Sequence, residues 1–322
     1  MVVGHSPSGD SLYPSEISQF ARHGYVVGKK LAGSWAPFLH GIVFQGLGLP
    51  WGQVRLELED MGKFINLVHH PQFFGAAVTM PNKVAILSYL DEMTDECRDI
   101  GACNTLYLRQ GPERPILCGA NTDAIGIRDS FFQNIKPSER TFYNRPALVF
   151  GGGGAARSAV YALRKWLNVT TIYIINRDKG EVDAVLQDCL KRGYGENLLH
   201  VQTVSQAQDL DTPGAIVSCI PDFEPQTAEE IMARNMIEVF FDRETKGFIL
   251  EMCYNPTPFT RLAAIAEAQG WNVILGTEAL IWQGLEQDRL WTCRDIDEGL
   301  VEEVREAVAR KINEIEAVSR PK

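Results

Sequence analysis

The sequence predicts an α/β protein built from two domains. Short apolar segments typical of buried strands alternate with longer segments whose apolar residues recur every three or four positions, as in helices. The length of 322 residues exceeds the usual size of a single hydrophobic core. A glycine-rich turn between a strand and a helix begins well inside the chain, so a complete domain should precede it.

The glycine-rich turn belongs to a strand–helix–strand unit. Residues 147–150 are wholly apolar, 155–167 have helical spacing of apolar residues, and 171–175 are β-branched and aromatic. Gly151, Gly153 and Ala156 fit the pattern G-x-G-x-x-[GA], which permits a tight turn and a close approach of the backbone to a pyrophosphate. Because strand and helix flank the pattern correctly, we predict a Rossmann-type dinucleotide site rather than an ordinary glycine-rich turn.

The end of the second strand should contact the adenosine ribose. An acidic residue there accepts hydrogen bonds from ribose hydroxyls, whereas an arginine suits the 2′-phosphate of NADP. The chain offers Asn176, Arg177 and Asp178, which point to both cofactors. Because Asp178 would repel a dianionic phosphate, we predict NAD, with NADP as the alternative if Arg177 dominates.

The remaining elements follow from the same periodicities. Residues 1–22 are expected to form a polar leader. Strands are expected at 24–28, 54–58, 75–79, 103–108, 116–119, 199–204, 215–218, 239–242, 248–252 and 273–275, with the fourth and fifth forming a hairpin. Helices are expected at 38–44, 61–69, 81–89, 124–133, 181–191, 228–236, 258–269, 276–287 and 297–317, the last of them amphipathic.

Composition and charge narrow the class of function. A formal net charge of −10 argues against nucleic acid and anionic membranes as partners, since both need clustered cations. Seven scattered cysteines without a C-x-x-C pair suggest reduced thiols, and His69–His70 lacks partners at metal-ligand spacing, so no metal is expected. We find no secretory signal and no apolar run of membrane-spanning length, and expect a cytoplasmic protein.

Four stretches concentrate polar residues where strands end or helices begin. They are residues 75–83 (GAAVTMPNK), 100–105 (IGACNT), 119–123 (GANTD) and 276–284 (GTEALIWQG). The first places Thr79 and Lys83 at a carboxyl edge, where open α/β sheets bind ligands. Taken singly, helix capping by Asp123 and an exposed first-turn Lys83 would explain two of them.

Taken together, these stretches resemble the shikimate/quinate dehydrogenase family. The family motif S-x-S-P-x-x-H-N is approximated by SWAPFLHG (34–41), N-V-T-x-P-x-K by AVTMPNK (77–83), and I-G-A-x-N-T and N-T-D-x-x-G by residues 100–105 and 121–126. The glycine loop and the N-R after the next strand match residues 151–157 and 176–177. Y-x-P-x-x-T aligns with residues 254–260 with one extra residue, and G-x-x-x-L-x-x-Q-G with 276–284, so the resemblance runs in order from about 28 to 291.

The resemblance implies both a domain division and residue roles. It implies a catalytic domain of residues 1–123 plus 276–322 and an inserted dinucleotide domain of residues 124–275. Lys83 and Asp123 would be the catalytic pair. The substrate's carboxylate and hydroxyls would be held by Ser34, Thr79, Asn104 and Gln283, with Tyr254 close by. The glycine loop, including Gly154 and Ala155, would bind the cofactor together with Asn176, Arg177 and Asp178, and the Gly276 backbone would approach the nicotinamide.

Oxidation of a ring alcohol fits these residue types. A base must remove the hydroxyl proton while a hydride leaves the same carbon for the nicotinamide. Partial burial would favour the neutral, basic form of Lys83, whereas Asp123 favours the charged form and would orient the amine and relay the proton.

Departures from the family pattern bear on the substrate. Ala36 replaces the second serine, Gly41 replaces an asparagine and Ala77 replaces the asparagine before V-T. Ala36 removes a hydroxyl donor and leaves room for the extra hydroxyl of quinate. Together with the preference for NAD expected from Asp178, this predicts catabolic oxidation of quinate to 3-dehydroquinate with NAD, with shikimate as a second substrate. The alternatives are an NADP-dependent shikimate dehydrogenase and a non-catalytic quinate sensor. The sequence leaves monomer and homodimer open.

Overall fold

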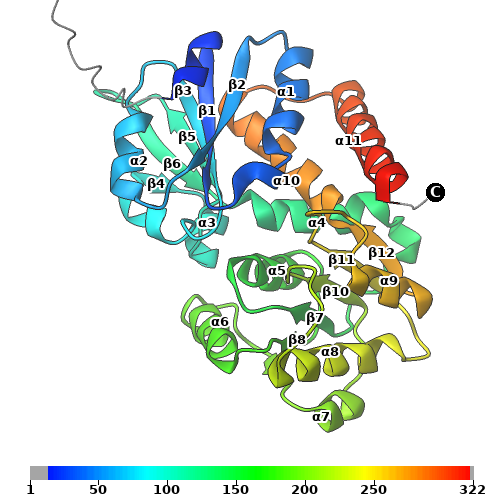
Figure 1. Cartoon of the computed structure of the whole chain (residues 1–322). Helices are drawn as coiled ribbons and strands as arrows, with labels where there is room; N and C mark the ends of the chain where they lie inside the picture. The colour runs from blue at the N-terminus through cyan, green and yellow to red at the C-terminus, as the bar shows by residue number, and fades with distance from the viewer. Residues whose placement is uncertain (1–13, 320–322) are drawn as a thin grey trace, which may run out of the picture.

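The computed structural model describes residues 14–319, which form two lobes, each built on its own six-stranded sheet (Figure 1). The chain completes the first sheet, crosses to the second lobe through helix α4 (Thr122–Asn134), and returns through α10 (Gly276–Thr292) and α11 (Glu298–Ser319). The α/β class predicted from the sequence is confirmed.

The first sheet is mixed, with strand order β2-β1-β3-β5-β6-β4. β5 runs antiparallel to β3 and β6, forming with β6 the predicted hairpin, while the other pairings are parallel. Its strands are β1 (Arg22–Gly28), β2 (Trp51–Glu57), β3 (Phe73–Val78), β4 (Glu92–Met93), β5 (Thr105–Arg109) and β6 (Ile116–Ala120). The accompanying helices are α1 (Ala36–Gly46), α2 (Met61–Val68) and α3 (Asp95–Ile100), with 3-10 turns at Ser15–Gln19, Leu31–Gly33 and Ala85–Tyr89.

The second sheet is parallel throughout, in the order β12-β11-β10-β7-β8-β9. The direction of winding reverses between β7 and β10, and open α/β sheets bind ligands outside the carboxyl ends of the strands at such a point. The strands are β7 (Ala147–Phe150), β8 (Ile172–Ile175), β9 (Leu198–His200), β10 (Ala215–Ser218), β11 (Phe248–Glu251) and β12 (Asn272–Leu275). The helices are α5 (Gly154–Lys165), α6 (Lys179–Lys191), α7 (Val204–Asp209), α8 (Ala228–Phe241) and α9 (Arg261–Ala268), with a 3-10 turn at Pro137–Glu139.

The long last helix packs on the first lobe. The apolar stripe of α11 is buried through Leu300, Val304 and Val308, in one cluster with Trp35 and Leu39 of the α1 region and with α10. Figure 1 shows α11 lying alongside α1. The predicted stripe is therefore covered within the chain itself.

The strand predicted at 239–242 is wrong, because these residues continue α8 to Phe241. Ala233, Ile237, Phe240 and Phe241 are buried together against one face of the second sheet, which is the periodicity of a helix rather than of a strand. The β-branched and aromatic residues at the end of this helix imitate a strand in sequence, while packing decides the outcome.

The helix predicted at 81–89 is reduced to turns followed by the 3-10 helix Ala85–Tyr89. The carbonyl of Lys83 accepts from the Cys103 backbone N–H at 2.7 Å, so a long-range bond replaces a helical one.

The predicted strand at 199–204 ends at His200, and Thr203 caps α7. Helices α3 and α7 and strand β4 were not predicted from the sequence. Of the predicted leader, residues 1–13 lie outside the described part, and 14–22 contain a 3-10 turn and the start of β1.

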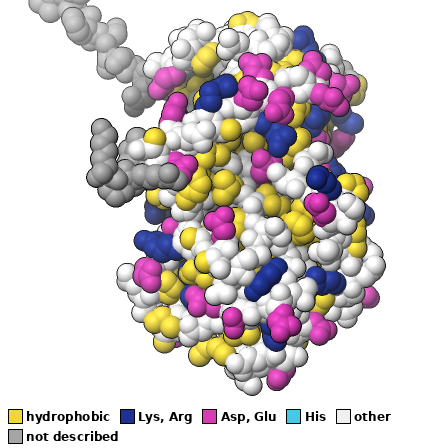
Figure 2. All heavy atoms as spheres, turned by 90° about the vertical axis from the view of Figure 1, so that its right-hand side faces the viewer, with side chains coloured by type: hydrophobic (Ala, Val, Ile, Leu, Met, Phe, Trp, Pro, Cys, Tyr) yellow, Lys and Arg dark blue, Asp and Glu magenta, His cyan; other side chains and the backbone are white. Residues whose placement is uncertain are grey.

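Charged side chains of both signs are interspersed on the face shown in Figure 2, and apolar side chains gather near its middle. A phosphate backbone would require a continuous field of cations. On that face neither sign of charge forms such a field. No helix within residues 14–319 combines the length and the apolar character needed to cross a bilayer.

Candidate active site

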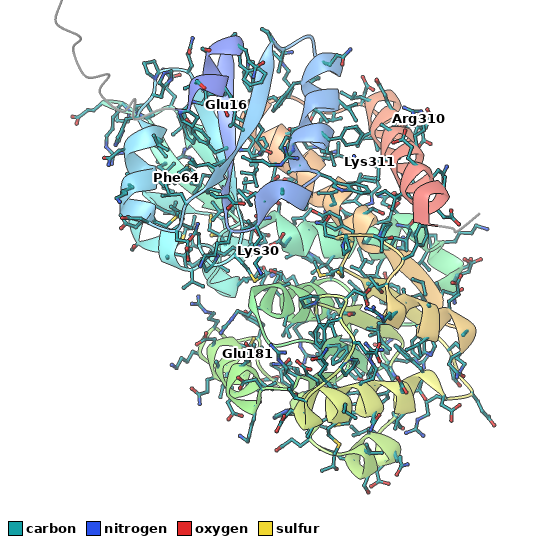
Figure 3. The ribbon with its side chains drawn as sticks, viewed as in Figure 1. Glu16, Lys30, Phe64, Glu181, Arg310 and Lys311 are labelled. Atoms are coloured by element: carbon teal, nitrogen blue, oxygen red, sulfur yellow. The ribbon has the colours of Figure 1, made fainter. Side chains whose placement is uncertain are left out.

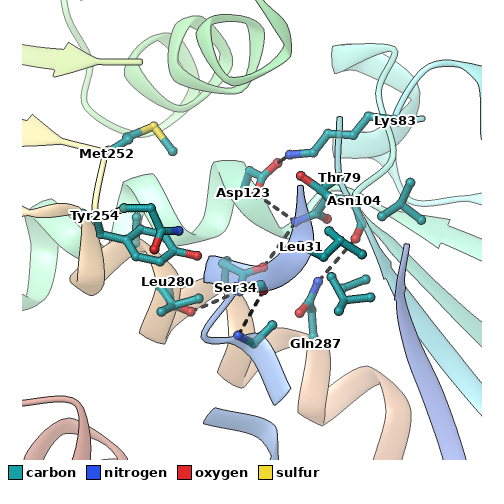
Figure 4. A pocket seen from close by; sticks show the side chains of 18 of the residues that line it. Leu31, Ser34, Thr79, Lys83, Asn104, Asp123, Met252, Tyr254, Leu280 and Gln287 are labelled. Atoms are coloured by element: carbon teal, nitrogen blue, oxygen red, sulfur yellow. Dashed lines mark hydrogen bonds and ion pairs between the residues drawn. The ribbon is translucent and has the colours of Figure 1, made fainter. Parts of the chain in front are cut away.

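A cavity of about 240 Å³ lies where the ends of β1 and β3 face α10 and the segment after β11 (Figure 4). The family resemblance assigns eight residues to catalysis, to the substrate or to the nicotinamide end, and all eight line this one cavity. They are Ser34, Thr79, Lys83, Asn104, Asp123, Tyr254, Gly276 and Gln283. Segments far apart in sequence are therefore brought to a single site.

Lys83 and Asp123 form an ion pair at the cavity wall. Lys83 Nζ lies 2.5 Å from Asp123 Oδ2, and their side chains are 18% and 16% exposed (Figure 4). Lys83 follows β3, while Asp123 occupies the first turn of α4, where the helix dipole favours a carboxylate. Asn121 caps this helix by accepting from the Ala124 N–H at 3.2 Å. The pair is thus fixed from both sides and still open to a ligand.

Asn104 orients the carboxylate of Asp123. Its Nδ2 donates to Asp123 Oδ1 and to Thr122 Oγ1, both at 2.9 Å, and its Oδ1 accepts from Thr105 Oγ1 and from the Thr122 N–H, both at 2.7 Å. Gln287 Nε2 on α10 donates to Thr105 Oγ1 at 2.9 Å. This buried network holds one oxygen of Asp123 and leaves the other for Lys83. Contact of Asn104 with substrate stays a prediction.

The rest of the cavity wall carries hydroxyl groups and positive charge. Burial, reinforced by the Asp123 carboxylate, raises the pKa of Tyr254 to about 12, so its phenol remains a hydrogen-bond donor. Ser34 Oγ accepts from the Ala36 N–H at 3.3 Å. Three lysines and one carboxylate line the cavity, although Lys29 is paired with Glu59 at 2.7 Å. Lys30 forms no ion pair within residues 14–319 and lies at the side of the first lobe that faces the second (Figure 3).

Gly276 is required for close packing. It begins α10, and a Cβ at this position would lie 2.4 Å from the carbonyl oxygen of Met252. Only glycine lets the start of α10 meet the end of β11 while its backbone lines the cavity.

A second cavity of about 370 Å³ lies over the glycine turn at the reversal of the second sheet. Gly151, with φ of 139°, makes the turn after β7. A Cβ on Gly153 or Gly154 would meet nothing within 4 Å, and no side chain caps α5, so the N–H groups at its start remain available. Gly154 and Ala155 form the first turn of this helix. The open glycine face and the uncapped helix fit a dinucleotide pyrophosphate.

The ribose end of this cavity contains two acids that were not predicted from the sequence, Glu181 and Glu230. Asn176 Nδ2 donates to Glu181 Oε2 at 2.7 Å, and both line the cavity. Arg177 is paired with Glu230 of α8. Asp178 instead caps α6, with its Oδ1 accepting from the Gly180 N–H at 2.7 Å, and it does not line this cavity. An acid in the first turn of α6 was the available signal for Glu181.

The two cavities adjoin each other. Thr79 lines the first and Met80 the second, while Cys219 Sγ of the second lies 3.6 Å from Met252 Sδ of the first. A group bound in the first cavity can therefore meet the end of an extended ligand that enters from the second. Among the described residues, no three His, Cys, Asp or Glu side chains are grouped to hold a metal ion.

Behind the cavities, the buried carboxyl of Glu251 links stability to pH. It is 1% exposed, and burial raises its pKa to about 8 from an ordinary 4.5. The carboxyl of Glu251 ionises at a lower pH in the unfolded chain than in the folded protein. Its contribution to the free energy of unfolding is therefore complete in acid and is lost as pH rises between these two pKa values. A Glu251→Gln variant should therefore gain free energy of unfolding relative to wild type between about pH 5 and about pH 8. Urea unfolding at both pH values measures this, and an equal difference at both would contradict it.

Comparison with known proteins places this site in a family. A profile of the shikimate dehydrogenase substrate binding domain matches residues 26–106. The quinate dehydrogenase of Emericella nidulans is 46% identical over 309 residues, which cover 90% of this chain and 94% of that protein. The structure of dehydroquinate dehydratase and shikimate dehydrogenase from S. pombe AroM superposes with a TM-score of 0.72 at 29% identity, covering 88% of this chain and 52% of that one.

A Thermus thermophilus shikimate 5-dehydrogenase, solved with NADP(H) and shikimate, gives a TM-score of 0.69 at 28% identity, covering 89% of this chain and 99% of that one. The likeness thus extends over both lobes. The chain belongs to the shikimate/quinate dehydrogenase family of oxidoreductases.

Proposed function

We propose that this enzyme oxidises quinate to 3-dehydroquinate with NAD, and that shikimate, oxidised to 3-dehydroshikimate, is a second substrate. The Lys83–Asp123 pair carries the proposal, because it lies in a cation-rich cavity beside the glycine-turn cavity. The 46% identity to a quinate dehydrogenase supports the choice of substrate. We also propose residues 1–123 with 276–322 as the catalytic domain and 124–275 as the dinucleotide domain.

Lys83, in its neutral amine form, is proposed to accept the proton of the hydroxyl that is oxidised and so become the ammonium. As this proton moves to Nζ, the carbon–oxygen single bond becomes a carbonyl double bond, and the hydrogen on that carbon leaves as a hydride. Bound nicotinamide supplies the hydride acceptor. Asp123, held by Asn104 on one oxygen, stabilises the ammonium that forms and fixes the direction of the amine. Both partners are mostly buried, which strengthens their interaction.

The substrate carboxylate is proposed to bind at the Ser34 and Tyr254 end, with Lys30 supplying charge. Quinate carries one hydroxyl on the carbon that bears this carboxylate, and shikimate has none there. Ala36 lines the same cavity and presents only a methyl group, which leaves space for this hydroxyl. The Thr79 and Gln283 side chains complete the proposed contacts to the ring hydroxyls.

NAD is favoured over NADP by the charge of the ribose end. Glu181 lines the cavity and can accept a hydrogen bond from a ribose hydroxyl, as acids do in this fold. Asp178 adds negative charge beside it. The rival is an NADP-dependent shikimate dehydrogenase, which Arg177 favours and which corresponds to the ligands of the Thermus relative.

Initial rates with quinate and shikimate, each with NAD and with NADP, test the proposal. We expect the highest kcat/KM for quinate with NAD, measured from the absorbance of the reduced nicotinamide. A higher value for shikimate with NADP would establish the rival. Binding of quinate without turnover in any of the four combinations would instead point to the sensor.

An Ala36→Ser variant should change the preference between the two acids. The added hydroxyl fills the space assigned to the quinate hydroxyl and restores a donor for the shikimate carboxylate. We expect the quinate-to-shikimate ratio of kcat/KM to fall by about tenfold, the effect of a modest clash. Ala32→Ser, an exposed change in the 3-10 turn Leu31–Gly33 that precedes α1, is the matched control. Equal ratios in wild type and Ala36→Ser would contradict the assignment of this end of the cavity.

A further inference from the structure

The cation expected to recognise a 2′-phosphate is already engaged by a carboxylate. Arg177 Nη1, just after β8, pairs with Glu230 Oε1 in the first turn of α8, across the second cavity. The Arg177 side chain is 56% exposed, whereas that of Glu230 is 10% exposed. The guanidinium also lies 5.8 Å from the centre of the Phe223 ring. Arg177 therefore does not face the cavity as an unpaired cation.

Glu230 is held in place independently of Arg177. Its Oε2 accepts from the Gln226 N–H at 2.9 Å and from the Thr227 N–H at 3.2 Å, while Thr227 Oγ1 accepts from the Glu230 N–H at 3.2 Å. This is a capping box, and it anchors the carboxylate at the positive end of the α8 dipole. These backbone bonds, followed by Arg177, hold the pKa of Glu230 below its ordinary value. Glu230 is thus a fixed anion in the cavity wall.

Asp178, which the sequence singles out as the group that excludes phosphate, is placed differently. Its Oδ1 accepts from the Gly180 and Glu181 N–H groups at 2.7 and 3.2 Å as the cap of α6. It lines a shallow hollow next to the second cavity rather than the cavity itself. Its charge is therefore partly balanced by the helix and lies outside the enclosed space.

We propose that Glu230 is a specificity-determining residue that selects NAD against NADP, by pairing with Arg177 and by placing its own negative charge where a 2′-phosphate would bind. A phosphate that contacted Arg177 would either lie against the Glu230 carboxylate that already pairs with Nη1 or have to displace it, which leaves an unpaired carboxylate beside a dianion. The 2′-hydroxyl of NAD requires no such rearrangement. This inference rests on the proposed use of a nicotinamide dinucleotide.

The test is a Glu230→Gln variant. Glutamine keeps the length of the side chain and can still cap α8, but it carries no charge and releases Arg177. Dissociation constants of NADH and NADPH are measured by nicotinamide fluorescence in the full-length protein. We expect the affinity for NADPH to rise by about tenfold or more, while that for NADH changes by less than about threefold, since a lost charge repulsion and a gained ion pair act on the phosphate alone.

Two further variants make the test specific. Glu229→Gln removes the same charge from the neighbouring residue of α8, which has no ion pair with Arg177 within residues 14–319, and it should leave the ratio of the two dissociation constants nearly unchanged. Adding Arg177→Ala to Glu230→Gln should abolish the gain for NADPH.

The inference is overturned if Glu230→Gln leaves the ratio of the two dissociation constants unchanged, or if Glu229→Gln shifts it equally. A shift with Asp178→Asn in place of Glu230→Gln would return the selection to Asp178. Failure of the wild type to bind either dinucleotide would overturn the proposed function itself, and this inference with it.

Discussion

A Lys83→Ala variant is expected to lose about three orders of magnitude in kcat for quinate oxidation with NAD, within the range typical of a lost general base. Lys83 is the residue whose amine lies against Asp123 in the cavity, and alanine leaves no group to receive the hydroxyl proton. The KM for NAD should change little, because Lys83 does not line the second cavity. Steady-state rates at saturating quinate and NAD measure the effect.

A matched control separates the base from the general charge of the cavity. Lys29 lines the same cavity but is paired with Glu59 and is 57% exposed. Lys29→Ala should keep kcat within about threefold of wild type, because an exposed ion pair contributes little. If Lys83→Ala retained wild-type kcat, the base would have to be another group, and the mechanism proposed for this cavity would be wrong.

The largest effect on stability is expected for the buried pair that joins α1 to α10. His40 Nδ1 lies 2.9 Å from Asp288 Oδ1 and 3.0 Å from Oδ2, and both side chains are fully buried. Burial raises the pKa of Asp288, an effect opposed by His40. His40→Ala would leave the carboxyl without this partner and remove the ring from its contact with Trp291. We expect a loss of about 3–5 kcal/mol in the free energy of unfolding, measured by urea denaturation.

A double-mutant cycle tests the coupling directly. The double variant His40→Ala with Asp288→Ala should be more stable than the sum of the single losses predicts, because no carboxyl remains buried without its partner. Arg310→Ala, which removes an exposed ion pair with Glu306 on α11, should change stability by no more than about 0.5 kcal/mol. Strict additivity of the two buried substitutions would contradict the assigned interaction.

The parts of the fold that were predicted correctly depend on local signals. The strand at 147–150, the glycine turn and the helix after it are specified by adjacent residues, and the structure places Gly151 at the positive φ that the turn requires. The motif residues that line the first cavity were found through the family resemblance, because their meeting depends on α10 returning from the end of the chain. No local pattern brings Gln283 to Asn104.

The errors arose where tertiary contacts decide. Residues 239–242 have strand-like composition, but their burial in the helix–sheet interface keeps them helical. The carbonyl of Lys83 makes no helical hydrogen bond, because it accepts from the Cys103 backbone N–H instead. Glu230 follows Arg177 by more than fifty residues, and only the packing of α8 against a face of the sheet brings the Glu230 side chain in its first turn to Arg177 after β8. Such partners cannot be read from a single sequence.

Direct transfer of a hydride between the two adjoining cavities is the central claim, and an isotope label tests it most directly. Quinate carrying deuterium on C3 is incubated with the enzyme and NAD, and the reduced cofactor is analysed by mass spectrometry. We predict that the reduced cofactor carries the deuterium from quinate, because hydride transfer between the cavities involves no exchange with water. Reduced cofactor without deuterium, formed while 3-dehydroquinate accumulates, would contradict direct transfer.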